Sequence, residues 1–220
     1  LKGSATLSLL DAGMAVGSSV RQGKLGWMLG VRKARARRFF STQELKGNYQ
    51  PDYTDVQGTL TLRPSARHTL ELLGIAAQHN FLLDPGTRKT YFGTVSFDPT
   101  KPSNLESIWL NYDGKERAGF HTYFGGMRWS SWLGSSARLA QELAYFETVE
   151  EEARDVRADA VLYQVDPGSG EHVPEGSARQ RDVANNQVRV QTWTATQRWQ
   201  FYPHGHALEG GAYVRQLVFT

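Results

Sequence analysis

The clearest pattern of hydrophobic and polar residues lies between Tyr53 and His79. Two runs there alternate apolar with polar side chains, which is the period of a β-strand with one apolar face. A polar segment at 63–67 separates the runs, and its proline has no backbone N–H to donate to a sheet. We therefore predict an antiparallel hairpin with a short turn at 63–67. Its apolar positions are Val56, Gly58, Leu60 and Leu62 on the first strand and Leu70, Leu72, Gly74 and Ala76 on the second.

Weaker alternation predicts strands along most of the chain. Two short strands around a tight turn at Asp11-Ala12-Gly13 are expected within 5–20, and a strand at 25–31 follows them. The next predicted hairpin has strands at 116–133 and from 137 onward, the latter continuing in polar form as far as Val165. A last hairpin is predicted at 187–202 and 208–218. Helical periodicity is present only at 137–149, where the preceding glycine turn favours a strand.

Short and long connections alternate between these strands. Short polar turns are predicted at 21–24, 63–67, 134–136 and 203–206, and long polar loops at 41–52, 80–115 and 166–184. Such alternation is typical of outer-membrane barrels, which have short periplasmic turns and long extracellular loops. We therefore predict an all-β fold, an antiparallel up-and-down transmembrane β-barrel located in the outer membrane.

The composition is compatible with this fold. The chain has 220 residues, of which 40% are hydrophobic, and a formal net charge of +3. No run of about 18 apolar residues is present, which excludes a helical membrane protein, whereas barrel strands need only half of their positions to be apolar. The sequence has no cysteine, so disulfides and thiolate metal sites are excluded. The small, mixed charge does not indicate a nucleic-acid partner.

Several segments together resemble the barrel of TonB-dependent receptors of the type common in Bacteroidetes. They are GSATLSLLDAGMAVGSSV, GKLGWMLGVRK, YTDVQGTLTLRPSARHTLELLGIAAQHN, YDGKERAGFHTYFGGMRWSS, LAYFETVEEEARDV and RQRDVANNQVRVQTW. The resemblance covers essentially the whole chain and is one of pattern, without an invariant catalytic motif.

The resemblance implies an outer-membrane barrel of about 22 strands, filled by an N-terminal plug domain and driven through a TonB box. Residues 1–220 would then be a partial barrel domain of about 8–9 strands, lacking the plug and the remaining strands. The implied function is uptake of a scarce nutrient such as a siderophore or an oligosaccharide. The implied partners are outer-membrane lipid and lipopolysaccharide, the protein's own plug domain, the TonB complex and an extracellular small ligand. The N-terminus LKGSATLSLL has neither an initiator Met nor a signal-peptide pattern, so we expect the chain to begin inside a longer protein or after a processed segment.

Aromatic and basic residues suggest contacts with a membrane. Rings near strand ends or on apolar faces are candidates for an interfacial girdle, because amphipathic rings prefer the headgroup region. These rings are Trp27, Tyr123, Trp129, Trp132, Trp193, Trp199, Phe201 and Tyr202. The basic residues Lys33, Arg35, Arg37 and Arg38 follow a strand and could meet lipopolysaccharide phosphates, although a solvated strand end is the favoured interpretation.

No motif indicates an enzyme. A nucleophile elbow, a phosphate loop and zinc-ligand spacings are all missing, so we expect no catalytic, metal or cofactor site. His204 and His206 share a Pro/Gly turn without a third ligand, and the acidic run Glu150 to Glu152 with Asp155 is interpreted as a solvated strand face. Isolated histidines at 68, 79, 121 and 172 show no catalytic partner. Ligand-binding residues remain unknown at this stage.

Polar residues of the predicted strands are expected to line the interior of the barrel or the plug. They are Asp55, Gln57, Thr59, Glu142 and Arg215. Two alternatives remain open: a complete small outer-membrane barrel with a structural or adhesion role, and a soluble β-sandwich that binds glycans. The sandwich predicts apolar faces that pack on each other, whereas a barrel predicts one continuous apolar band on the outside.

Overall fold

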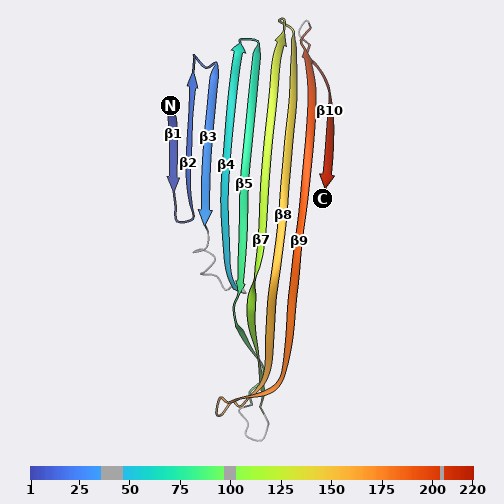
Figure 1. Cartoon of the computed structure of the whole chain (residues 1–220). Helices are drawn as coiled ribbons and strands as arrows, with labels where there is room; N and C mark the ends of the chain where they lie inside the picture. Colours follow the sequence, from blue (N-terminus) through green and yellow to red (C-terminus); the bar gives the residue numbers. More distant parts are fainter. Residues whose placement is uncertain (36–46, 97–102, 204–205) are drawn as a thin grey trace.

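A computed structural model describes residues 1–35, 47–96, 103–203 and 206–220 as one antiparallel sheet of ten strands (Figure 1). The strands are β1 (Lys2–Leu7), β2 (Asp11–Val20), β3 (Leu25–Arg35), β4 (Gly47–Ser65), β5 (His68–Pro85), β6 (Arg88–Thr94), β7 (Asn104–Leu133), β8 (Ala137–Val165), β9 (His172–Phe201) and β10 (Leu208–Phe219). Their order in the sheet is β1-β2-β3-β4-β5-β7-β8-β9-β10, with β6 paired to β7. The predicted all-β, up-and-down antiparallel fold is confirmed, and an open sheet of this kind fits a segment of a barrel.

The predicted central hairpin has the expected register. Leu60 lies opposite Leu72, and Leu62 lies opposite Leu70, so the two apolar rows coincide. The chain reverses after Ser65, where a bulge between Leu62 and Ser65 absorbs the polar residues predicted as a turn. The first predicted turn is displaced: Ser8 to Leu10 connect β1 to β2, and Asp11 already belongs to β2.

Short turns do lie at one end of the sheet, but the predicted long loops are wrong over most of their length. The connections at 21–24, 66–67 and 134–136 lie together at the upper end in Figure 1. Most of 80–115 and 166–184, however, belongs to β5, β6, β7 and β9, and β4 already begins at Gly47. Residues 41–46 and the prolines at 99 and 102 lie outside the described part of the chain. The strands therefore extend far beyond the predicted hairpins, and β7 and β9 each contain 30 residues.

Two turn signals do not reverse the chain. At Asp113-Gly114 the glycine has φ of 110°, a conformation that L-residues rarely adopt, and β7 continues through it. At Asp84-Pro85-Gly86 the chain breaks without reversing, because β5 pairs with β7 up to Leu83 and β6 resumes along the same edge at Arg88. β5 and β6 are thus one interrupted strand, and the reversal into β7 comes after Thr94.

The described residues form a single layer. Contacts between elements follow the order of the sheet, and few side chains are buried: Ala140, Val149 and Val165 are the buried hydrophobic ones. No second sheet packs on either face of the described strands. No described helix is long and apolar enough to cross a membrane.

The sheet has two open edges. β1 and β10 lie on opposite sides of it, and neither has an outer neighbour in the described part of the chain (Figure 1). β10 covers β9 only from Arg189 onward, so the preceding part of β9 also lacks an outer partner there.

Candidate functional site

The register assigns every strand residue to one of two faces. We call face A the face that carries Leu60, Leu72, Met127 and Leu143, which lie directly opposite one another on consecutive strands. Face B carries the residues between them in sequence, such as Arg128, which lies opposite both Glu71 and Glu142. Because side chains alternate along each strand, these pairings fix the face of all others.

Face A carries an apolar band next to the short turns. The band covers about nine residues of each strand, or ~27 Å, which is close to the 9–11 residues of a membrane-spanning strand. Its apolar and small residues are Leu25, Trp27, Leu29, Val31, Val56, Gly58, Leu60, Leu62, Leu70, Leu72, Gly74, Ala76, Tyr123, Gly125, Met127, Trp129, Leu139, Leu143, Tyr145, Trp193, Ala195, Trp199, Gly210, Ala212 and Val214. One polar pair, Gln141 opposite Gln197, lies within it. Leu29 is 50% exposed, Met127 44% and Trp193 48%, although all three are large and apolar. No described segment covers them.

Face B is more polar over the same stretch, although Met28, Leu73, Ile75, Phe124 and Phe146 also lie on it. The five residues predicted to line an interior, Asp55, Gln57, Thr59, Glu142 and Arg215, all lie on this face. Ion pairs connect neighbouring strands here: Arg32 Nη2 lies 2.6 Å from Asp55 Oδ2, and Arg128 Nε lies 3.4 Å from Glu142 Oε1. Their common face is confirmed, whereas their role in lining a lumen remains a prediction.

Most of the predicted girdle rings belong to face A. Trp27, Trp129 and Trp199 lie on the side of the short turns, while Tyr123 and Trp193 lie toward the opposite border of the band. Neighbouring rings pack together, with 4.5 Å between the centroids of Tyr145 and Trp193. Trp132 is an exception because it lies on face B, and Tyr202 follows the end of β9.

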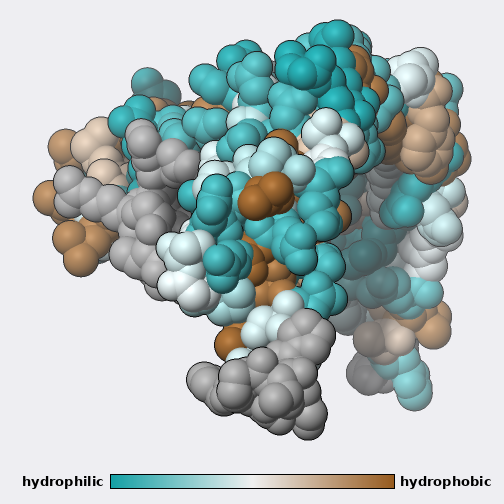
Figure 2. Space-filling model, turned by 90° about the horizontal axis from the view of Figure 1, so that it is seen from below, coloured by the Kyte–Doolittle hydropathy of each residue, from teal (hydrophilic) through white to brown (hydrophobic). Residues whose placement is uncertain are grey.

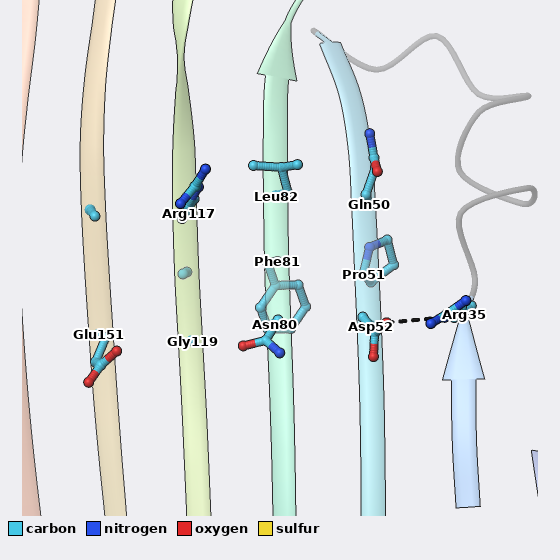
Figure 3. A pocket seen from close by; sticks show the side chains of 12 residues that line it. Arg35, Gln50, Pro51, Asp52, Asn80, Phe81, Leu82, Arg117, Gly119 and Glu151 are labelled. Carbon is cyan, nitrogen blue, oxygen red and sulfur yellow. Dashed lines mark hydrogen bonds and ion pairs between the residues drawn. The ribbon is translucent and has the colours of Figure 1, made fainter.

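A hollow of about 740 Å³, lined by charged and apolar residues, adjoins the band on face A (Figure 3). Arg35 from β3 and Asp52 from β4 line one side and pair at 3.3 Å, while Arg117 and Glu151 come from β7 and β8. Lys33 also pairs with Asp52 and donates a 2.8 Å hydrogen bond to Thr54. Two of the predicted basic residues therefore lie at the border of the band and share one carboxylate. Arg37 and Arg38 lie outside the described residues.

Further from the short turns, face A becomes charged. Arg181 pairs with Asp155 at 2.8 Å and Arg179 with Asp159 at 2.6 Å, across β8 and β9. The hydrogen bonds from Arg181 hold the pKa of Asp155 below its ordinary value, and the bond from Arg179 does the same for the pKa of Asp159. Figure 2, which views the molecule from this end, shows a largely hydrophilic surface. Face A of the strand segments beyond the apolar band is therefore suited to contact with water.

The predicted acidic run is divided between the faces. Glu151 and Asp155 lie on face A, where Glu151 accepts a 2.8 Å hydrogen bond from Gln187. Glu152 lies on face B beside Arg154 and Asn186. Among the described residues no cluster of acidic, histidine or cysteine side chains could hold a metal ion. His206 is exposed, and its predicted companion His204 lies outside the described residues.

An aromatic cluster at the far end of the hairpins was missed by sequence reasoning. Trp109, Tyr163 and His172 come from β7, β8 and β9, and their ring centroids lie 4.8 to 5.9 Å apart. Tyr91 of β6 joins through His172 at 5.9 Å, and the Lys89 ammonium lies 3.7 Å above the Trp109 ring. These residues are far apart in the sequence, so periodicity alone could not group them. The cluster packs β6 against β7, β8 and β9 at the end of the sheet opposite the short turns.

Comparisons with known proteins supply no family. No protein-family model matches the chain, and neither a curated protein nor a solved structure matches it significantly. Functional inference therefore proceeds from the two faces of the sheet and from the pattern of the sequence.

Proposed function

We propose that the sheet is part of a transmembrane β-barrel in a bacterial outer membrane, of the TonB-dependent receptor type, which takes up a scarce nutrient. The observation that carries the proposal is the uncovered apolar band on face A. It has the length of a membrane-spanning strand, and the reverse side of the sheet is more polar. In this arrangement lipid contacts the band, and lipopolysaccharide contacts the charged border at Lys33 and Arg35.

The open edges support closure into a larger barrel. Unpaired backbone N–H and C=O groups cost several kcal/mol each in hydrocarbon, so an edge strand does not face lipid. β1 and β10 each have an unpaired side in the described part of the chain. Further strands therefore continue the sheet on both sides until it closes. The receptor type rests on the resemblance of the sequence segments, and it adds a plug domain against face B and energy from the TonB complex.

The two alternative functions fit the sheet less well. A β-sandwich needs a second layer on the apolar face, and the described strands form one layer. A complete small barrel needs a pairing between its first and last strands, and β1 and β10 do not pair. The band and the open edges thus favour a segment of a large barrel.

Lipid contact is tested by cysteine labelling, which is clean because the chain has no native cysteine. A bimane fluorophore is attached to single cysteines at Leu72, Met127, Leu73, Arg128 and Arg117 in the full-length protein, reconstituted in vesicles. Nitroxide-labelled lipids are expected to quench positions 72 and 127 strongly. Positions 73 and 128 on face B and position 117 beyond the band serve as matched controls and should be quenched weakly. Equal quenching at neighbouring positions would contradict a membrane location.

The receptor type is tested by photo-crosslinking from face B. A benzoylphenylalanine at Gln57 in the full-length protein is expected to form a crosslink within the same polypeptide, to a plug domain. The same group at Leu29, on face A of the adjacent strand, should form adducts with lipid instead. If Gln57 yields no protein adduct while Leu29 labels lipid, the barrel is unplugged and the receptor type is wrong.

A further inference from the structure

Face B changes character in the extended hairpins. Next to the short turns it carries charged residues such as Glu71, Arg128 and Glu142, but beyond Glu116 of β7 it becomes largely apolar. Leu110 and Tyr112 of β7 lie there opposite Ala160 and Ala158 of β8. Over the same stretch face A carries the Asp155 and Asp159 ion pairs. The apolar side of the sheet thus switches from face A to face B.

The apolar part of face B is hollowed into a trough of about 640 Å³, which is within the range of small-molecule pockets. Leu83, Leu110, Tyr112 and Val156 supply its larger apolar side chains, and all four are half-buried. The small side chains of the alanines at 158, 160 and 178 leave free volume at the bottom of the trough. Gly114, also on this face, adds no side chain between Tyr112 and Glu116. The trough therefore has apolar walls and free volume.

One side of the trough carries an excess of negative charge. Arg154 lies 2.8 Å from Asp182, 2.6 Å from Glu152 and 3.5 Å from Glu116. The hydrogen bonds from Asn186 and Arg154 hold the pKa of Glu152 below its ordinary value, so this carboxyl is ionised at neutral pH. The Arg154 guanidinium thus faces three carboxylates, of which Glu116 and Asp182 line the trough. Arg179 also lines the trough, but its guanidinium pairs with Asp159, which lies on face A. Glu116 is the least engaged of them, because the 3.5 Å contact with Arg154 is its sole polar interaction in the described part of the chain.

We propose that this trough binds a small amphipathic ligand with an apolar body and a cationic ammonium or guanidinium group. The apolar body lies against Leu83, Leu110 and Val156, and the cation is held between Glu116 and Asp182. The Tyr112 ring borders the same space and offers a cation–π contact. The excess of carboxylates over Arg154 favours a cation over an anion of the same shape. This proposal rests on the proposed function, since it gives the class of ligand that such a receptor would collect.

The test uses three naphthalene probes of nearly equal size on the full-length protein: naphthylmethylammonium, naphthylmethanol and naphthylacetate. Fluorescence titration is expected to show that the ammonium binds at least about tenfold more tightly than the acetate. The double variant E116Q/D182N should lose about tenfold in ammonium affinity. E151Q/D155N removes the same charge from face A, at residues that do not line the trough, and should leave that affinity unchanged. Tyr112→Leu, which changes no charge, should weaken binding of the ammonium probe but not binding of the alcohol or the acetate.

Preference for the acetate, equal binding of the three probes, or unchanged ammonium binding in E116Q/D182N would each overturn the proposal. The wild-type comparison alone decides between a cationic and an anionic ligand, so a variant that fails to fold does not obscure the result. Lipid quenching at Leu72 and Met127 reports the membrane location separately. If the protein does not prefer the ammonium probe but lipid still quenches positions 72 and 127, the proposed ligand class is wrong and the proposed function stands.

Discussion

Replacing Leu72 by arginine should destabilise the membrane-inserted protein by about 2–4 kcal/mol. Leu72 lies at the centre of the apolar band on face A, where an arginine would have to leave water for hydrocarbon. Replacing the adjacent Leu73 by arginine should cost at most about 1 kcal/mol, because residue 73 lies on the polar face B and is 38% exposed. Urea unfolding of the full-length protein in phospholipid vesicles, followed by tryptophan fluorescence, measures both changes.

The two variants differ in the face of the sheet that carries the arginine. Both substitutions put the same side chain on the same strand, so they alter net charge and strand propensity equally. A loss of similar size in both would show that face A does not meet lipid. A larger loss at Leu73 would place the membrane on face B and would invert the assignment of the two faces.

Replacing Gly114 by alanine is expected to cost about 1–3 kcal/mol in backbone strain, because this residue has φ of 110°. A Cβ there would also clash with the carbonyl oxygen of Asp155 on β8, so the two strands would have to separate locally. Hydrogen exchange should show lost amide protection on both sides of residue 114 in β7 and opposite it in β8.

Gly125 provides the control for this change. It lies in the same strand, and a Cβ added to it would meet no atom within 4 Å. Gly125→Ala should therefore leave exchange protection and unfolding unchanged. If Gly114→Ala were equally silent, the strand would not pass through residue 114 with the described pairing, and the predicted loop at 80–115 would regain support.

The alternation of apolar and polar residues predicted the fold near the short turns well. The coincidence of Leu60 with Leu72 and of Leu62 with Leu70 follows from one apolar face that must be continuous. The predicted common face of Asp55, Gln57 and Thr59 follows from the same periodicity. Where one face is apolar and the other polar, the sequence pattern sets the register.

The strand segments beyond the apolar band were predicted as loops for two reasons. Strands in water need no apolar row on face A, and these segments contain residue pairs that are typical of turns. Asp113-Gly114 forms an irregularity within β7, and Pro85-Gly86 interrupts a strand without reversing it. A usable signal was present: Val156, Ala158 and Ala160 alternate with charged residues, and β8 does end at Val165 as predicted. The trough could not be predicted, because Leu83, Tyr112, Arg154 and Asp182 meet through the register of four strands.

In the proposed barrel, the switch of the apolar side from face A to face B would also fix how deeply the sheet sits in the membrane. Sliding the sheet along its strands by two residues moves it by about 7 Å. Repeated steps in one direction would carry Glu151 and Asp155 into hydrocarbon, and steps in the other would expose Trp27 and Leu72 to water. In the proposed barrel, lipid would therefore oppose sliding in both directions, and the strand segments beyond the band would stay at a constant height above the bilayer.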